Sequence, residues 1–232
     1  MEIDMECASH TLKISGGENS LPSHIERTLS VRPSIRPVSR VLIVFAALAL
    51  SLTYFLPLWR IALDAPQYPE GLGIEIWINQ MKGQNPNDLA KINNLNHYIG
   101  MKKINPASIA ELKVMPWVMR AMLLFGIAVG ILGKRKLLLF WLITFIIVAL
   151  VGFVDYYLWG YDYGHNLDFE HAIIKIPGMN YQPPLIGSKQ LLNFTATSFP
   201  GSGGWAAIGS FVLGLVIWVY ETRRQFKEAR NA

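Results

Sequence analysis

The chain has one cysteine, Cys7, and few charged residues for its length. A single thiol excludes an internal disulfide, a CxxC pair and a metal site made of several thiolates. Of the 232 residues, 16% are charged and 52% are hydrophobic, whereas soluble domains are about 25% charged. This shortage of charge excludes an ordinary soluble domain and indicates a membrane protein.

Catalytic signatures are missing as well. The sequence contains no GxSxG, no HExxH, no Walker loop and no GxGxxG that opens a helix. Asp168 and Glu170 are spaced as an acid–base pair, but two exposed carboxylates explain the same spacing. We therefore expect no enzymatic activity. No small-x-small cleavage site follows the first apolar block, so we expect this block to remain as a signal anchor.

What the chain does have is four long apolar stretches. Each is close to the ~20 residues that an α-helix needs to cross a ~30 Å hydrocarbon layer. Their apolar residues are clustered rather than spaced at the period of a soluble core helix. We therefore predict four transmembrane helices, over residues 41–58, 114–133, 137–158 and 205–220.

Basic residues gather at one end of each of these stretches. The net charge is +5, and its placement follows the bias of membrane proteins toward positive cytoplasmic loops. Both termini are therefore predicted to lie inside. The lipid bilayer, not nucleic acid, is the expected partner of the basic residues. These are Arg27, Arg32, Arg36, Arg40, Lys134, Arg135, Lys136, Arg223, Arg224, Lys227 and Arg230.

The predicted fold class is an all-α membrane protein with four transmembrane helices and a small α+β unit in its first outer loop. In that loop, residues 73–79 alternate like a strand, and Asp88 is placed to cap a helix over 89–93. The predicted parts are a flexible cytoplasmic tail (1–38), the first span (39–59), an outer, periplasmic loop (60–113), the second span (114–133), a cytoplasmic turn (134–136), the third span (137–158), a second outer loop (159–204), the fourth span (205–220) and a cytoplasmic tail (221–232).

Two charged residues lie inside the predicted spans. Arg120 and Asp155 are each about one turn from the outer end of antiparallel neighbouring helices. An ionised group at such a depth is costly and usually finds a partner. We therefore predict a structural Arg120–Asp155 ion pair. A proton relay and separate snorkelling of the two side chains to the interface are the alternatives.

The outer loops contain the residues best suited to bind a metal. Imidazole and thioether groups together favour copper, because soft sulfur ligands suit Cu(I). Such a site assembles only if the two outer loops meet, and each histidine taken alone is more often a simple surface residue. The candidate copper ligands are His97, Met101, His165, His171 and Met179.

Five segments in and beside the outer loops have a distinctive local sequence: LPLWRI (56–61), APQYPEGL (65–72), NHYIGM (96–101), YGHNLD (163–168) and IPGMNYQPP (176–184). These segments resemble a family of bacterial membrane proteins found with nitrous-oxide-reductase gene clusters, the NosB-like proteins. The resemblance covers about residues 40–220. It implies an inner-membrane protein with periplasmic loops that works beside the maturation of a copper enzyme.

These observations lead to three functional hypotheses. The first is an accessory or assembly protein that handles copper for a periplasmic copper enzyme such as nitrous oxide reductase, with a copper chaperone or that enzyme as partner. The second is a structural subunit that docks a larger membrane complex through its outer loops. The third is a small transporter, against which the absence of internal repeats argues.

Overall fold

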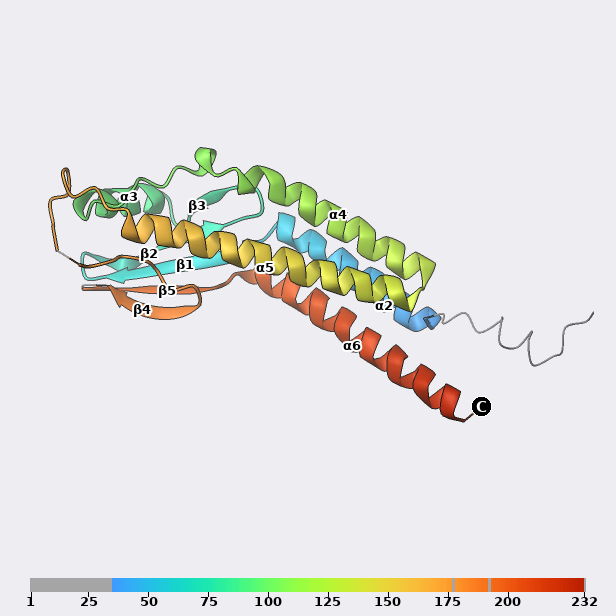
Figure 1. Cartoon of the computed structure of the whole chain (residues 1–232). Helices are drawn as coiled ribbons and strands as arrows, with labels where there is room; N and C mark the ends of the chain where they lie inside the picture. The colour runs from blue at the N-terminus through green and yellow to red at the C-terminus, as the bar shows by residue number, and fades with distance from the viewer. Residues whose placement is uncertain (1–34, 177, 192, 232) are drawn as a thin grey trace, which may run out of the picture. The chain divides into compact units, whose positions relative to one another are not determined.

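Four long apolar helices dominate the computed structural model, which describes residues 35–231 except 177 and 192. Each is long and apolar enough to cross a membrane. They are α2 (Pro37–Ala49), extended by a 3₁₀ turn (Leu50–Tyr54), α4 (Glu111–Leu132), α5 (Arg135–His165) and α6 (Ser202–Arg230) (Figure 1). Cys7 and most of the predicted tail 1–38 lie outside the described residues.

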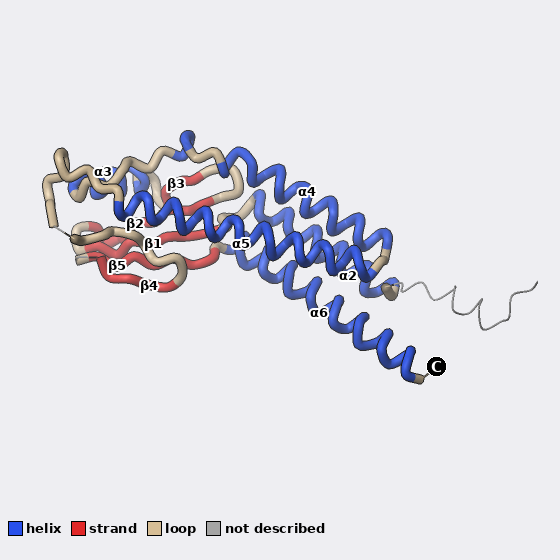
Figure 2. The backbone as a smooth tube through the Cα atoms, in the orientation of Figure 1, coloured by secondary structure: helices blue, strands red, loops and turns tan. Residues whose placement is uncertain are grey.

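A five-stranded antiparallel sheet lies beyond one end of α2, α4 and α6, and the end of α5 runs on alongside it (Figure 2). The predicted all-α fold class is therefore wrong. The prediction failed because the second outer segment also supplies strands, which pair with strands of the first outer segment. In the order β3-β2-β1-β5-β4, the strands are Met81–Gly83, Tyr68–Ile76, Trp59–Ala65, Phe194–Pro200 and Gly187–Leu191.

The central strand β1 and its neighbour β5 are joined almost directly to membrane helices. Strand β1 begins five residues after the 3₁₀ turn that extends α2, and β5 is separated from α6 by Gly201 alone. The backbone N–H of Gly201 donates to Leu58 O at 2.9 Å, and the N–H of Gly203 donates to Pro57 O at 2.9 Å. These bonds hold the start of β1 against the start of α6. The middle of the sheet is thus fixed to two spans.

Helix packing in the bundle centres on Trp141 of α5, which is fully buried. Its indole Nε1–H donates to Met122 O of α4 at 3.0 Å. A Cβ atom at Gly126 or Gly214 would come within 3.0 Å of the indole ring. Small residues at these two positions therefore allow α4 and α6 to close around the large side chain.

At the other end of the bundle, α2 and α6 meet through the buried carboxylate of Glu221. Ser39 Oγ–H donates to Glu221 Oε1 at 2.6 Å, and Arg224 Nη2 lies 3.3 Å from Glu221 Oε2. A buried carboxylate is costly unless it is paired and hydrogen-bonded. Oε1 is thus hydrogen-bonded and Oε2 is paired with Arg224, and the Ser39 bond joins the first span to the last.

Helix α3 (Asp88–Tyr98) covers one face of the sheet. Its first residue, Asp88, is only 1% exposed. The Asp88 carboxylate Oδ2 accepts the backbone N–H of Gly73 in β2 at 3.1 Å and that of Asn85 at 2.9 Å. Asp88 thus ties the helix to the sheet, while the cap position itself is held by Asn87 in a left-handed conformation.

Candidate functional site

The strands, α3 and the polar segments around them form one folded part, which we call the head (residues 59–110 and 159–200). Its two outer segments are joined by backbone hydrogen bonds. Asp168 N–H donates to Gly100 O at 2.7 Å, and the N–H groups of Ile173 and Ile174 donate to Tyr98 O at 3.1 and 2.9 Å. The two outer loops therefore meet, as a metal site shared between them requires.

Helix α5 does not stop at the predicted boundary of the third span, residue 158, but continues into the head as far as His165. Its last turns carry tyrosine, aspartate and histidine without a proline, so nothing in the sequence ends the helix earlier. Lys102 Nζ pairs with Asp162 Oδ2 at 2.8 Å, and Tyr163 Oη–H donates to Lys103 O at 3.3 Å. These bonds attach the first outer segment to the extended helix.

Two candidate copper ligands have a fixed ring orientation. His171 Nδ1 lies 2.8 Å from Asp168 Oδ2, and His165 Nδ1 lies 3.1 Å from Tyr161 O. A neutral imidazole that donates through Nδ1 keeps the lone pair of Nε2 for a metal. The His171 imidazole and two backbone N–H groups also hold the pKa of Asp168 below its ordinary value.

The five candidate ligands are not gathered into one metal site. Among the described residues, no group of three or more His, Cys, Asp or Glu side chains is placed to hold a metal ion. His97 is exposed at the end of α3, whereas the Met101 side chain lines an apolar cavity. Met179 is half-buried in the segment before β4. Copper binding by these residues stays a prediction.

The predicted ion pair between Arg120 and Asp155 is not among the ion pairs of the described residues. Counted from the turn that joins α4 and α5, Arg120 is about 20 Å along its helix and Asp155 about 33 Å, at 1.5 Å per residue. This offset separates the two groups along the bundle, because Asp155 lies 22 residues from Gly133 of the turn and Arg120 lies 13. Arg120 instead lies over the Trp117 ring, 4.6 Å from its centroid.

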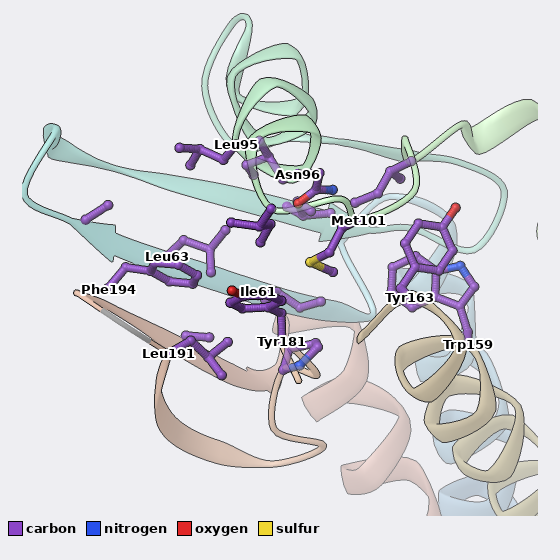
Figure 3. A pocket seen from close by; sticks show the side chains of 17 residues that line it. Ile61, Leu63, Leu95, Asn96, Met101, Trp159, Tyr163, Tyr181, Leu191 and Phe194 are labelled. Carbon is purple, nitrogen blue, oxygen red and sulfur yellow. The ribbon is translucent and has the colours of Figure 1, made fainter. Parts of the chain in front are cut away.

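An apolar cavity of about 70 Å³ lies inside the head (Figure 3). Its walls come from β1, α3, the outer end of α5 and the β4–β5 pair. Most of the lining is hydrocarbon, and the Met101 sulfur and the Tyr181 hydroxyl are among its few heteroatoms. The side chains that define its ends include Leu63, Leu95, Trp159, Tyr163, Leu191 and Phe194.

Tyr181 is the polar residue placed most deeply in this cavity. Its side chain is only 2% exposed, and Figure 3 shows its ring among the lining side chains with the oxygen directed inward. The Tyr181 hydroxyl is buried without a hydrogen-bond partner among the described residues. Burial raises the pKa of Tyr181, so the hydroxyl stays protonated at neutral pH.

Gly164 of α5 places Tyr181 in the cavity. Tyr181 N–H donates to Gly164 O at 3.0 Å, and a Cβ at Gly164 would collide with the backbone of Gln182. The chain therefore passes directly over the helix at this glycine. The sequence analysis did not single out Tyr181. Its neighbours Gln182, Pro183 and Pro184 were the only local signal of a constrained segment.

Comparison with protein-family models finds no match for this chain, and a search of curated proteins finds none either. The function is therefore argued from the geometry of the head.

Proposed function

We propose that the protein is an accessory or assembly protein of a bacterial inner membrane, and that its head docks a protein partner on the periplasmic side. The observation that carries this proposal is a group of exposed apolar side chains where the two outer segments join. We call it the junction patch. It consists of Tyr98, Phe169, Ile173 and Ile174, which are 43 to 65% exposed.

The backbone around the junction patch is well held, which suits a preformed docking surface. Tyr98 O accepts two backbone bonds from Ile173 and Ile174, and the Asp168 carboxylate accepts the N–H groups of Glu170 and His171 at 3.0 and 3.2 Å. Apolar side chains exposed together on a fixed backbone are typical of interaction sites. A rigid surface also loses less conformational entropy on binding.

The anchoring of the head supports a docking role over transport. Helices α4, α5 and α6 each run as one continuous helix, whereas transporter sites are typically built from interrupted helices near the bilayer centre. The head is instead bonded to the ends of the spans through Leu58 and Gly201. It therefore presents a partner with a platform that has a fixed orientation to the membrane.

The docking proposal is tested by affinity purification of the full chain from native membranes. Ile173→Asp and Ile174→Asp place a charge in the junction patch, so we expect the partners of the wild-type protein to be lost. Ile186→Asp changes an equally exposed isoleucine elsewhere in the head and should retain them. Identical partner sets in all four samples would refute docking through this patch.

Copper handling is a second candidate, favoured by the oriented rings of His165 and His171. Each ring is held through Nδ1, which leaves Nε2 directed outward as a ligand. Within residues 35–231, apart from 177 and 192, no group of three or more His, Cys, Asp or Glu side chains is placed to hold a metal ion. Copper would therefore bind the chain alone through few ligands at His171, beside the junction patch, and would gain further ligands from the docked partner.

Metal titration separates the copper candidate from simple docking. We expect His171→Ala to weaken Cu(I) binding by the purified protein, and His165→Ala combined with it to weaken binding further. Lys175→Ala, in the same segment, serves as the control. If the purified wild-type protein takes up no Cu(I), or the triple variant at His97, His165 and His171 binds Cu(I) as the wild type does, copper handling by these histidines is ruled out.

A further inference from the structure

The apolar cavity of the head contains a hydroxyl group that nothing in the described chain satisfies. Tyr181 Oη is buried without a hydrogen-bond partner there, although the cavity around it has free space of about 70 Å³. A buried hydroxyl without a hydrogen-bond partner destabilises the folded state. Such a group in a native fold calls for an occupant that completes its hydrogen bonding.

Ordered water is a poor occupant of this cavity. A buried water needs two to four polar partners, and the described lining supplies few. The Asn96 side chain already donates to Lys102 O at 3.4 Å, and Tyr163 Oη donates to Lys103 O. The remaining lining is aliphatic or aromatic. An apolar molecule with one oxygen matches these surroundings better than water does.

We propose that the cavity is a binding site for a small uncharged ring that carries one hydroxyl or carbonyl oxygen, which hydrogen-bonds to Tyr181 Oη. This site is separate from the junction patch and does not depend on the docking function. The ring is inferred from the lining, because Trp159, Tyr163, Tyr181 and Phe194 all border the cavity. Aromatic side chains pack favourably on rings.

The Met101 side chain strengthens the choice of a ring over an alkyl chain. Its sulfur points into the space that the aromatic side chains surround (Figure 3). Thioether sulfur makes favourable contacts with ring edges and adapts to irregular shapes. An apolar cavity about twice this size is known to stay dry and to take up benzene, so here part of the ring or its substituent would extend toward the opening.

The position of the site suggests how the ligand arrives. Trp159 and Tyr163 lie on α5 just beyond the predicted third span, and both line the cavity. Tryptophan and tyrosine at this position are typical of the membrane interface. Small uncharged rings accumulate in that region of a bilayer, so the membrane itself would supply the ligand.

The site is tested with full-length protein in lipid nanodiscs and two probes of nearly equal shape, 4-fluorophenol and 4-fluorotoluene, followed by ¹⁹F NMR. We expect saturable binding of both rings, with the phenol bound more tightly by the wild type. Tyr181→Phe removes one oxygen and no volume. It should weaken phenol binding about five- to tenfold, as loss of one hydrogen bond predicts, and leave toluene binding unchanged.

A second variant serves as a control for Tyr181→Phe. Ala65→Leu fills the cavity and should abolish binding of both probes, with a thermal unfolding scan to show that the variant is folded. Equal affinity of 4-fluorophenol for the wild type and Tyr181→Phe would overturn the proposal. So would the absence of saturable binding, or a lipid chain that copurifies in the cavity and blocks both rings.

Discussion

At the scale of single residues, the side chains that hold the head together are polar and buried. Asp88 is the clearest case, because one carboxylate oxygen accepts backbone N–H groups from both β2 and the turn before α3. A charged acceptor makes these bonds stronger than bonds between neutral groups. Asn93 acts similarly, since its amide accepts Ile104 N–H at 2.7 Å and donates to Ile104 O at 3.1 Å.

Replacing Asp88 should weaken the head. Asp88→Ala leaves the buried N–H of Gly73 and the partly buried N–H of Asn85 without this acceptor, so we expect the free energy of unfolding to fall by about 2–3 kcal/mol. Thermal or denaturant unfolding of the purified protein measures the change. Asp64→Ala removes an exposed carboxylate from the neighbouring strand and should change stability by less than about 0.5 kcal/mol. Equal effects of the two changes would contradict this role of Asp88.

The Asp168–His171 pair predicts a pH dependence. The lowered pKa of Asp168 means that the folded state favours the carboxylate. This contribution is present above the unfolded value of about 3.9 and is lost as pH falls through the lower folded value. We expect His171→Ala to raise the pKa of Asp168 toward its ordinary value in a ¹³C NMR titration. Phe169→Ala, which leaves the hydrogen bonds to the carboxylate in place, should not.

At the scale of elements, α5 both crosses the membrane and supports the head. Its 31 residues correspond to about 46 Å at 1.5 Å per residue, which exceeds a ~30 Å hydrocarbon layer. The surplus length bears Trp159 and Tyr163, whose rings lie 4.5 Å apart between centroids. It also bears Gly164, over which the segment with Tyr181 passes. The cavity is thus built partly on a membrane helix.

Two glycines of α5 should respond in opposite ways to alanine. Gly164→Ala forces the segment at Gln182 away from the helix, so we expect lower thermal stability and a more exposed Tyr181. Gly160→Ala, one turn earlier, meets no atom within 4 Å and should be neutral or stabilising, since alanine favours a helix by about 1 kcal/mol over glycine. Tyrosine fluorescence and a thermal scan distinguish the two. A harmless Gly164→Ala would refute the close passage.

At the scale of the whole molecule, hydrogen bonds connect the candidate spans to the sheet at one end of the bundle and to one another at the opposite end. The spans meet the sheet through Leu58 and Gly201, and at the opposite end α2 meets α6 through Ser39 and Glu221. The strands all lie at one end of the bundle, beyond α2, α4 and α6 and beside the end of α5 (Figure 2). The positive-inside bias predicts that this end is the outer one.

Labelling of single cysteines tests this orientation. In a Cys7→Ser background, Lys175→Cys in the head should react with a membrane-impermeant maleimide in intact cells. Arg230→Cys at the end of α6 should react only after the membrane is permeabilised. Labelling of position 230 in intact cells, with position 175 protected, would reverse the predicted topology.

The sequence predicted the features that depend on neighbouring residues and missed those that depend on distant ones. The four apolar stretches correspond to four helices able to cross a membrane, because length and hydropathy are local properties. Strand β4, with the sequence GSKQL, has no apolar alternation. It pairs with β5, which in turn pairs with β1. No local pattern reveals that pairing.

In the candidate site too, contacts between residues close in sequence were predictable and contacts between distant residues were not. His171 and Asp168 are three residues apart, so their contact lay within reach of the sequence. The burial of Tyr181 depends on a backbone contact with Gly164 across the head, which no spacing indicates. Arg120 and Asp155 were assumed to lie at equal depth, although Asp155 lies nine residues farther from the connecting turn than Arg120 does.

The central place of β1 has a consequence for biosynthesis. Strand β1 ends at Ala65, whereas β5, which covers one of its edges, begins at Phe194. At a synthesis rate of about 5–20 residues per second, roughly 6 to 26 s pass between the two strands. During that interval one edge of β1 has no strand to pair with, although β2 already follows it. The head is therefore begun early in translation and completed among the last parts of the chain, after three of the four spans have been made.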